Sequence, residues 1–398
     1  MMIEKIKEIV SSVKNEAISN RRHLHRFPEL SFQEYKTSEY VQSVLRSHAI
    51  DFEVVADTGV LAKIVGKKSN STQTVILRAD MDALPIHEEN DTDFTSQNEG
   101  IMHACGHDFH TANLLAVLSI LKEMEADFSG TVVGIFQPAE EKIPGGALSI
   151  LAAKKLPPPG PDVKGVIGLH VSPGLEVGRI GVRPGKFMAS ADEIFISLKG
   201  KGGHGAQPHL NIDPVVIAAQ LILSLQQIVS RFADPAIPSV LSFGKVLANG
   251  ATNVIPNEVT LEGTFRTMDE SWRKQALELI EKQIKELPPI YGATAEVEIR
   301  RGYPVLVNDE ALTGTVSSYL KDYVSADNFE QLGIWTAAED FAYYSYTYPA
   351  LFYFIGTGNA EKGMTSALHT PTFQIDEDAF EHAIGAMVYS VLQLLDHA

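Results

Sequence analysis

The chain has 398 residues, of which 44% are hydrophobic and 21% charged, and its formal net charge is −17. These proportions are typical of a folded protein and argue against a largely disordered chain. The length exceeds the roughly 250 to 300 residues at which a single hydrophobic core stops growing, so we expect two domains. The negative charge, without any basic stripe, argues against a nucleic-acid partner because a phosphate backbone would be repelled.

The longest apolar stretches, residues 114–121 and 215–223, fall short of the roughly 18 residues that span a bilayer. We therefore expect both to form buried helices and expect no membrane partner. At the N-terminus, Ile3, Ile6 and Val10 recur at helical spacing among charged residues, unlike the uninterrupted apolar core of a signal peptide. The single cysteine, Cys105, suits a reducing compartment. These features predict a cytoplasmic protein.

Strand-like and helical runs alternate along the first half of the chain. Strands are expected at 74–80, 130–137 and 164–171, and a helix at 111–124. This alternation predicts an α/β fold with a layered, mostly parallel sheet. Chemically capable side chains follow the expected strands: Asp80, Asp82, Glu140, Glu141 and His170. Since ligands bind outside the carboxyl ends of strands in open α/β sheets, we expect these residues to share one cleft.

The order of elements changes between residues 184 and 304. Strands and helices are expected at 191–200, 214–232, 239–248, 257–267, 272–287 and 293–302, which gives a βαββαβ pattern typical of a small ferredoxin-like unit. The chain then returns to a strand at 351–356 and a final helix from about Asp378. We predict a discontinuous catalytic domain, 1–184 and 304–398, and an inserted lid, 185–303, with hinges at Pro184-Gly185 and 302–304.

A cluster of metal-binding side chains lies in the segment His103-Ala-Cys-Gly-His107-Asp-Phe-His110. A lone histidine is usually structural, but three histidines and the only cysteine fall within eight positions here. In an extended segment Cys105 and His107 would face the same way and could converge on one ion. Asp108 is the expected N-cap of the following helix. Thiolate and imidazole favour zinc, whereas the nearby carboxylates would suit manganese.

Two adjacent carboxylates, Glu140 and Glu141, end the expected strand at 130–137. Exposed Glu-Glu pairs are common and usually carry no function. Beside a metal ion, however, one carboxylate can act as a ligand. The other, with its pKa raised by burial and like charge, can take a proton from water and pass it to a leaving amine.

Together these motifs resemble the metal-dependent aminoacylase and carboxypeptidase superfamily, in the branch of hippurate hydrolases, plant auxin-conjugate hydrolases and bacterial N-acyl-amino-acid amidohydrolases. Nine motifs occur in order along nearly the whole chain, and their order makes the resemblance specific. They are RRHLHRFPELSFQE, LRADMDALP, HACGHDFHTA, FQPAEE, GLHV, GKGGHGAQPH, ATNVIPNEVTLEGTFRT, AAEDFA and ALHTP.

The resemblance implies two divalent metal ions per subunit, Mn²⁺ or Zn²⁺, with Ni²⁺ or Co²⁺ as alternatives. It implies that the ligands are Cys105, His107, Glu141, His170 and His369. Glu140 becomes the general base and acid, and Asp82 orients the site. At the first strand end, Arg78-Ala-Asp80-Met-Asp82 stands where the broader superfamily has a metal-binding His-x-Asp. The partition of ligands between the two metals therefore stays open.

The resemblance also implies that the lid is a dimerisation domain, which forms a homodimer, closes over the site and lends residues to a neighbouring subunit. It makes His204 the candidate to stabilise the tetrahedral oxyanion. Asn253 and Arg266 become substrate clamps, with Arg266 suited to a carboxylate, and Gly356 lets the backbone approach the substrate. Without the resemblance, His204 would be a loop bystander, Arg266 a surface charge and Gly356 a turn residue.

We therefore expect hydrolysis of N-acyl-L-amino acids, with an acetyl, benzoyl or similar acyl group, to a carboxylic acid and a free amino acid. A dipeptidase or a deacetylase of N-acetyl-diaminopimelate type is the alternative within the superfamily. A cysteine hydrolase using Cys105 with His103 or His107, and a metal-binding scaffold without turnover, are the alternatives outside it. The remaining histidines are expected to be structural: His23, His25 and His87, with His103 and His110 close to the site.

Overall fold

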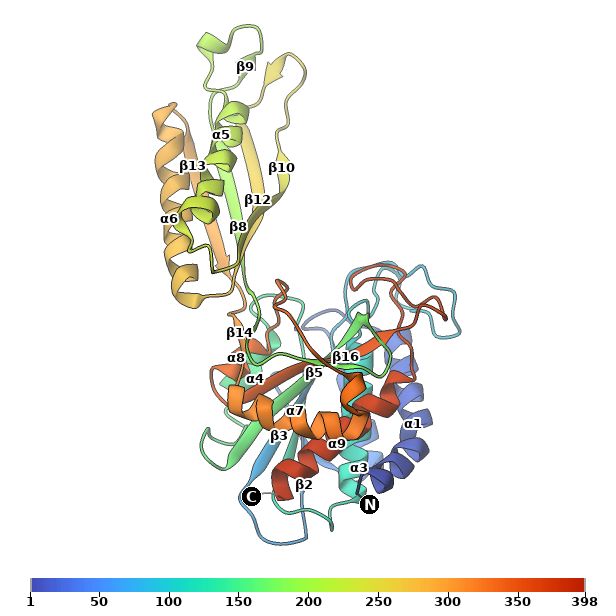
Figure 1. The fold of residues 1–398 in the computed structure, drawn as a ribbon. Coiled ribbons are helices and arrows are strands. Elements are labelled where there is room, and N and C mark those ends of the chain that lie inside the picture. The colour runs from blue at the N-terminus through green and yellow to red at the C-terminus, as the bar shows by residue number, and fades with distance from the viewer. Residues whose placement is uncertain (1, 397–398) are drawn as a thin grey trace. The chain divides into compact units, whose positions relative to one another are not determined.

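The computed structural model describes residues 2–396, so residue 1 and residues 397–398 of the expected catalytic domain lie outside the described residues. The chain divides into two compact units, each visible in Figure 1. The first comprises Met1–Phe187, Val307–Gly333 and Asp340–Ala398, and the second comprises Met188–Leu306 and Ile334–Glu339. The second unit was expected to be the continuous range 185–303, but it also includes the short segment Ile334–Glu339.

An eight-stranded sheet forms the centre of the first unit, in the order β1-β2-β4-β3-β5-β16-β6-β15. The middle strands β4, β3, β5 and β16 are mutually parallel, whereas β1, β2 and β6 each make an antiparallel pair nearer the edges. The strands are β1 (Asp51–Val55), β2 (Gly59–Val65), β3 (Thr74–Asp80), β4 (Thr131–Gln137), β5 (Val163–Glu176), β6 (Ile180–Val182), β15 (Phe329–Gln331) and β16 (Ala350–Gly358). The predicted α/β class with a mostly parallel sheet is confirmed.

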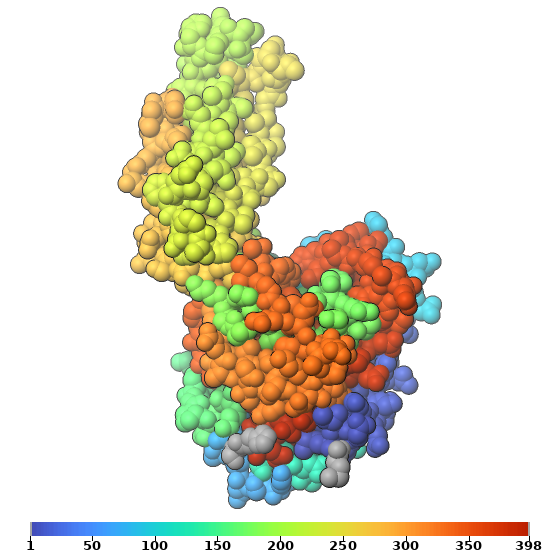
Figure 2. Space-filling model, viewed as in Figure 1, coloured from blue at the N-terminus to red at the C-terminus, as the bar shows by residue number. Residues whose placement is uncertain are grey.

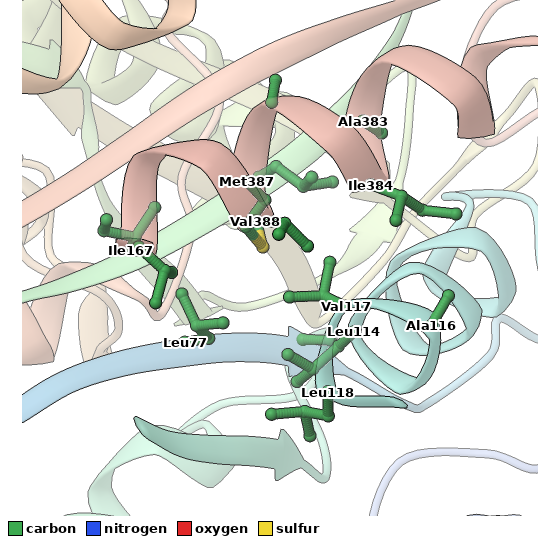
Figure 3. Close-up of a cluster of buried hydrophobic side chains, with 14 of the residues drawn as sticks. Leu77, Leu114, Ala116, Val117, Leu118, Ile167, Ala383, Ile384, Met387 and Val388 are labelled. Atoms are coloured by element: carbon green, nitrogen blue, oxygen red, sulfur yellow. The ribbon is translucent and has the colours of Figure 1, made fainter. Parts of the chain in front are cut away.

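Helices α3 (His107–Glu123) and α9 (Ala379–Asp396) pack together against this sheet. Figure 3 shows Val117 of α3 and Val388 of α9 facing each other above Leu77 of β3. Strands β3 and β16 are buried along their whole length, which explains their nearly unbroken apolar sequences. The buried helix predicted over 114–121 is confirmed. The other helices of the unit are α1 (Met2–Arg26), α2 (Tyr35–Ser47), α4 (Gly146–Ala152), α7 (Glu310–Val324) and α8 (Ala342–Ser345).

The start of α3 differs from the prediction that Asp108 is its N-cap. The helix begins at His107, and Gly106 occupies the cap position with φ +81°, a conformation that glycine adopts without strain. Asp108 lies in the first turn, where its carboxylate accepts hydrogen bonds from Arg21 Nε at 2.7 Å and His25 Nδ1 at 2.8 Å. The N-cap prediction was wrong because this carboxylate ties α1 to α3 instead.

The second unit has the predicted βαββαβ order. Its elements are β8 (Ser190–Lys199), α5 (Pro214–Gln227), β10 (Ser239–Leu247), β12 (Glu258–Thr267), α6 (Glu270–Ile290) and β13 (Thr294–Arg301). The strands form an antiparallel sheet in the order β10-β12-β8-β13, which is a ferredoxin-like arrangement. Asp213 caps α5 by accepting a hydrogen bond from Val215 N at 2.8 Å.

The prediction of a buried helix over 215–223 is wrong for one side of α5. Leu221 and Leu225 are fully buried in the core of the unit, but Val216 is 56% and Leu223 70% exposed. Figure 2 shows this helix, in yellow-green, at the surface of the second unit. Pro214–Phe232 is long and apolar enough by length and composition to cross a membrane. The inner side of α5 packs against α6 and the sheet of the second unit. The outer side of α5 stays exposed.

Candidate metal centre

The first unit brings together all five side chains predicted to bind metal. Ligand atoms of Cys105, His107 and His170 lie within 4.8 Å of one another, and so do those of Cys105, Glu141 and His369. They come from the turn before α3, the first residue of α3, the middle of β5, the segment after β4 and the loop between β16 and α9. Cys105 and His107 converge although residues 104–106 form a turn rather than the extended segment assumed from the sequence.

The distances between these atoms suit ligands of shared cations. Cys105 Sγ lies 3.4 Å from His170 Nε2 and 3.2 Å from His369 Nε2. Glu141 Oε1 lies 3.2 Å from His369 Nε2 and 3.9 Å from His107 Nε2. Nitrogen, oxygen and sulfur atoms bound tetrahedrally to one zinc ion are about 3 to 4 Å apart, given bond lengths of about 2.0 to 2.3 Å. Cys105 and Glu141 each lie near two other candidate ligands.

Two of the buried histidines have one ring nitrogen tethered and the other directed at the cluster. His107 Nδ1 lies 3.3 Å from Asp82 Oδ1, and His170 Nδ1 donates to the carbonyl of Val171 at 2.7 Å. His107 Nε2 and Glu141 Oε1 are buried without a hydrogen-bond partner among the described residues. Buried polar atoms are rarely left unpaired, and ligating histidines usually carry such a tether on the other nitrogen. The donor set therefore fits divalent cations.

His110 has a different arrangement. Its Nε2 accepts a hydrogen bond from Val171 N at 2.9 Å, so Nδ1 carries the proton and donates to Asp80 Oδ1 at 2.7 Å. Both nitrogens are thus engaged by the protein. His110 joins the end of β3 to the middle of β5 and offers no lone pair to a metal.

The charge balance at the cluster also favours a cation. Burial lowers the pKa of His107, but Asp80, Asp82 and Glu141 outweigh it and raise this pKa to about 10. Burial and neighbouring His110 hold the pKa of His170 well below its ordinary value, so the imidazole stays neutral, as a ligand must be. Burial and the charge of Glu141 raise the pKa of the Cys105 thiol well above its usual range. This thiol is unsuited to act as a free nucleophile, which disfavours the cysteine-hydrolase alternative.

Asp82 organises the two adjacent carboxylates. Its Oδ1 accepts a hydrogen bond from Glu140 N and its Oδ2 one from Glu141 N, each at 2.9 Å. The hydroxyl of Ser31 donates to Oδ2 at 2.6 Å. Glu140 is buried, and one of its carboxylate oxygens lies within 4.8 Å of ligand atoms of His107 and Glu141. The candidate base therefore stands beside the cluster with its backbone fixed.

Several supporting residues were missed by sequence reasoning. The carboxylate of Asp340 accepts from Arg78 Nη2 at 2.8 Å, from Gln137 Nε2 at 2.8 and 2.9 Å, and from Ala147 N at 3.0 Å. It thereby links β3, the end of β4 and the start of α4, on both sides of Glu140. From the loop before α2, Glu34 binds Ala139 N next to Glu140, and Ser31 binds Asp82 after β3. Asp340, Ser31 and Glu34 all lie within the nine sequence motifs, and this position was the only sequence feature that could have identified them.

The other candidate residues occupy separate places. In the second unit, His204 lies on β9 (Gly203–His204) opposite Val254 of β11 (Val254–Ile255), next to Asn253. Arg266 lies on β12 and donates to Thr264 Oγ1 at 3.1 Å. In the first unit, the N–H of Gly356 donates to the carbonyl of Arg179 at 2.7 Å. A Cβ at Gly356 would lie 2.0 Å from the carbonyl oxygen of Glu176, so close packing accounts for this glycine.

The remaining histidines have varied surroundings. His25 is buried and bonded to Asp108 and Glu88, as expected for a structural histidine, and His23 stacks on Tyr40. His103 is buried, and burial lowers its pKa to about 4. Neither of its ring nitrogens has a hydrogen-bond partner among residues 2–396.

Comparison with known proteins identifies the family. Residues 76–393 match the model of peptidase family M20/M25/M40. The chain belongs to this family. An M20 chain of this kind is a hydrolase, and the resemblance inferred from the nine motifs is confirmed.

Similar members of the family include enzymes with known names. The chain is 45% identical over 312 residues to the N-acyl-L-amino acid amidohydrolase of Geobacillus stearothermophilus, covering 78% of this chain and 83% of that protein. It is 38% identical over 390 residues to the N-acetyl-L-cysteine deacetylase of Bacillus subtilis, covering 97% and 90%. The solved structure of the Bacillus subtilis YXEP protein, described as a dinuclear metal binding peptidase, matches with a TM-score of 0.79 and 34% identity, covering 98% and 100%.

Proposed function

We propose that this M20 protein hydrolyses the amide bond of N-acyl-L-amino acids and releases a carboxylic acid and a free amino acid. The observation that carries the proposal is the convergence of a thiol, three imidazoles and a carboxylate beside buried Glu140. Two relatives that match most of the chain are named for the removal of acyl groups from amino acids. The smaller acetyl and larger benzoyl groups are both candidate acyl groups.

The proposed cofactors are two divalent cations, held by Cys105, His107, Glu141, His170 and His369. Zn²⁺ suits the thiol and imidazoles, and Mn²⁺ suits the carboxylate, with Ni²⁺ or Co²⁺ as alternatives. The likeness to a dinuclear metal binding peptidase supports the number of ions. Bound divalent cations would supply Lewis-acid polarisation of the substrate carbonyl and would acidify a water molecule.

The residues of the chain carry the proton transfers. Glu140 takes a proton from the attacking water, whose oxygen bonds to the carbonyl carbon. Glu140 then gives that proton to the amide nitrogen as the carbon–nitrogen bond breaks. Asp82 keeps Glu140 aimed through the bond to its backbone N–H. The tether between Asp82 and His107 keeps one imidazole in a fixed orientation during both steps.

The second unit completes the proposal with substrate contacts. His204 would donate a hydrogen bond to the oxyanion that forms when the carbonyl is attacked. Its Nδ1 accepts from Ala206 N at 3.0 Å, so its proton would lie on Nε2 and be free to donate. Asn253 and Arg266 would bind the substrate carboxylate, and the backbone at Gly356 would lie along the substrate.

We further propose that the second unit mediates a cytoplasmic homodimer. Strand β10 is an unpaired edge of its four-stranded sheet, and apolar residues of α5 remain exposed beside the sheet. Pairing of two such edges would cover both features at once. The single cysteine suits the reducing cytoplasm.

A substrate panel tests this proposal directly. Protein stripped by a chelator and reconstituted with Zn²⁺ or Mn²⁺ is incubated with acetyl-, benzoyl- and aminoacyl-amino acids, and the released amino acids are quantified. We expect metal-dependent release from the acetyl or benzoyl compounds. Preferred release from the aminoacyl compounds would favour a dipeptidase, in line with the peptidase described for the YXEP protein. Preference for N-acetyl-diaminopimelate would indicate a biosynthetic deacetylase, and activity without metal would contradict the proposal.

A further inference from the structure

The loop between α1 and α2 carries the motif PELSFQE, to which the proposed function assigns no role. Two of its side chains reach the surroundings of Glu140, one after β3 and one after β4. Ser31 donates to Asp82, and Glu34 accepts from the backbone N–H of Ala139 at 2.8 Å. Ala139 directly precedes Glu140 in the sequence. The loop therefore contacts the segment of the candidate base directly through Glu34, and through Ser31 it contacts Asp82, which binds the same segment.

Glu34 is a buried carboxylate whose contacts are all uncharged. Its side chain accepts hydrogen bonds from Ala139 N and Phe32 N at 2.8 Å each and from the hydroxyl of Thr58 at 2.9 Å. The residue is 0% exposed. Burial, together with the charge of Asp82, raises the pKa of Glu34 to about 7. A carboxyl group in such a place costs folding free energy, which suggests a functional reason for its presence.

The backbone that Glu34 holds is strained. Ala139 has φ +53°, in the left-handed region that residues with a Cβ rarely adopt. The carbonyl of Ala139 accepts a hydrogen bond from Gly146 N at 2.9 Å. With its N–H bound by Glu34 and its carbonyl bound by Gly146, Ala139 is held in this conformation from both ends. The conformation of Ala139 in turn sets the direction in which the chain continues from β4 to Glu140.

We propose that Glu34 is a positioning residue for the hydrolysis, which holds Ala139 in its left-handed conformation so that Glu140 faces the cation cluster. The inference rests on the proposed function of Glu140. The hydrogen bonds of the Glu34 carboxylate go to Ala139, Phe32 and Thr58, and Ala139 is the only one of the three that adjoins Glu140 in the sequence. Asp82 holds the N–H of Glu140 and Glu141 independently. Loss of Glu34 should therefore affect catalysis more than metal binding.

The first test compares Glu34→Ala with Glu34→Gln in the metal-loaded enzyme. We expect Glu34→Ala to lower kcat about 30-fold, the scale of a small misplacement of a catalytic group, while KM and the number of bound cations stay unchanged. Glu34→Gln should keep most of the activity, because its amide oxygen can still accept from Ala139 N. Thr58→Val is the matched control, since it removes a hydrogen bond to the same carboxylate but leaves Ala139 bound. It should keep the wild-type kcat.

A double variant separates positioning from general stability. Glycine adopts positive φ without strain, so position 139 would no longer need Glu34 to hold it there. The double variant Glu34→Ala/Ala139→Gly should therefore have a kcat about 5-fold or more above that of Glu34→Ala. Residues in contact typically show coupling of this size. If Glu34→Ala lowers kcat as much in the Ala139→Gly enzyme as in the wild type, the inference is overturned. A Glu34→Ala enzyme with unchanged kcat would also overturn it. If Glu34→Ala does not fold, Glu34→Asp, whose carboxylate is withdrawn from Ala139, carries the same predictions.

Hydrogen exchange gives a readout that does not depend on activity. In the Glu34→Ala protein the amide of Ala139 should exchange faster than in the wild type, while Thr58→Val should leave it unchanged. Unchanged exchange at Ala139 would overturn the inference even if the enzyme is active. Wild-type protein that hydrolyses no N-acyl-amino acid would instead overturn the proposed function, so the two failures are distinguishable.

Discussion

The side chains around Cys105 are oriented by hydrogen bonds within the protein. Asp82 tethers His107 and the carbonyl of Val171 tethers His170, so each imidazole presents one nitrogen in a fixed direction. Cys105 lies within 3.4 Å of both His170 Nε2 and His369 Nε2. The thiol is therefore central among the candidate ligands, and its chemistry should decide which metal binds most tightly.

Replacing Cys105 tests this position. A serine hydroxyl is a poorer ligand than a thiolate for zinc, so Cys105→Ser should raise the Kd for Zn²⁺ by about 10-fold or more, with a smaller loss for Mn²⁺. Competition with a chromophoric chelator measures both values. The variant has no other cysteine to compensate. Equal Zn²⁺ affinity in wild type and variant would show that the thiol is not a ligand.

Asp82 allows a second test at the same scale. The amide nitrogen of Asp82→Asn cannot accept a hydrogen bond, so either Glu140 N or Glu141 N loses its partner. We expect kcat to fall about 10- to 100-fold, as is typical when the support of a site is removed. Ser31→Ala removes only the hydroxyl that donates to Asp82 and should lower kcat less. Equal losses in the two variants would count against a positioning role for the carboxylate.

The residues that could be predicted from sequence are those whose chemistry is unusual in itself. Clustered histidines with a cysteine, and adjacent glutamates after a strand, mark a site by composition. The contact of Glu34 with Ala139 and the contacts of Asp340 could not be predicted, because 105 residues separate the first pair and 193 to 262 residues separate Asp340 from its partners. A buried carboxylate is recognisable as such only once the fold brings its donors together.

The loop between β16 and α9 is the element that delivers His369. The N–H of His369 donates to the carbonyl of Ala104 at 2.9 Å, which joins the loop to the turn that carries Cys105. At the base of the loop, Asp376 is 2% exposed and accepts from Asn359 Nδ2 at 2.6 Å and Lys362 Nζ at 2.9 Å. Asp376 therefore links the two ends of the loop.

This anchor predicts a pH dependence. Burial raises the pKa of Asp376, but the hydrogen bonds from Lys362 and Asn359 lower it below its ordinary value. Its stabilising effect is then present above the unfolded pKa of about 3.9 and is lost as pH falls through the lower folded pKa. Asp376→Asn should reduce the free energy of unfolding by about 1 to 2 kcal/mol at pH 7. Urea denaturation should give a constant difference above about pH 5 that narrows below about pH 4. A difference that widens in acid would contradict this account.

The elements with strong sequence patterns could be predicted. The runs of β-rich and helical residues indicated the middle strands β3, β4, β5 and β16 of the first unit and the βαββαβ order of the second, whereas the edge strands β1, β2, β6 and β15 were not predicted. The errors came from side chains with tertiary partners. Asp108 was expected to cap α3, but Arg21 and His25 bind its carboxylate. The apolar sequence of α5 predicts that the helix is buried, but it does not show whether the second unit itself buries both sides of the helix.

At the scale of the whole molecule, the uncovered side of α5 and the free edge of β10 need an explanation. Leu223 is 70% and Val216 56% exposed, unusual for residues of this size in a helix that also contributes to a core. A homodimer formed through the second unit would bury them. If this proposal is correct, the dimer depends on the exposed side of α5 and the edge strand β10 of the second unit.

Leu223→Glu tests that proposal. A charge at the centre of an apolar interface should convert a dimer into a monomer, while the exposed side chain can change without unfolding the unit. Light scattering coupled to size exclusion measures the mass, and Lys282→Glu, on exposed α6 surface, is the matched control. We expect the monomer to keep its Tm and to lose about 10-fold or more in kcat if a neighbouring subunit supplies His204. A variant that remains dimeric would refute this interface.

The most direct test of the account as a whole is the turnover of Glu140→Gln with its metals bound. Glutamine keeps the shape of the side chain but cannot move a proton, so we predict a fall in kcat of about 10²- to 10⁴-fold on N-acyl-amino acids. Two cations per chain should remain bound, measured by elemental analysis of the same sample. Turnover near the wild-type value in a fully loaded Glu140→Gln enzyme would contradict the central role of this carboxylate.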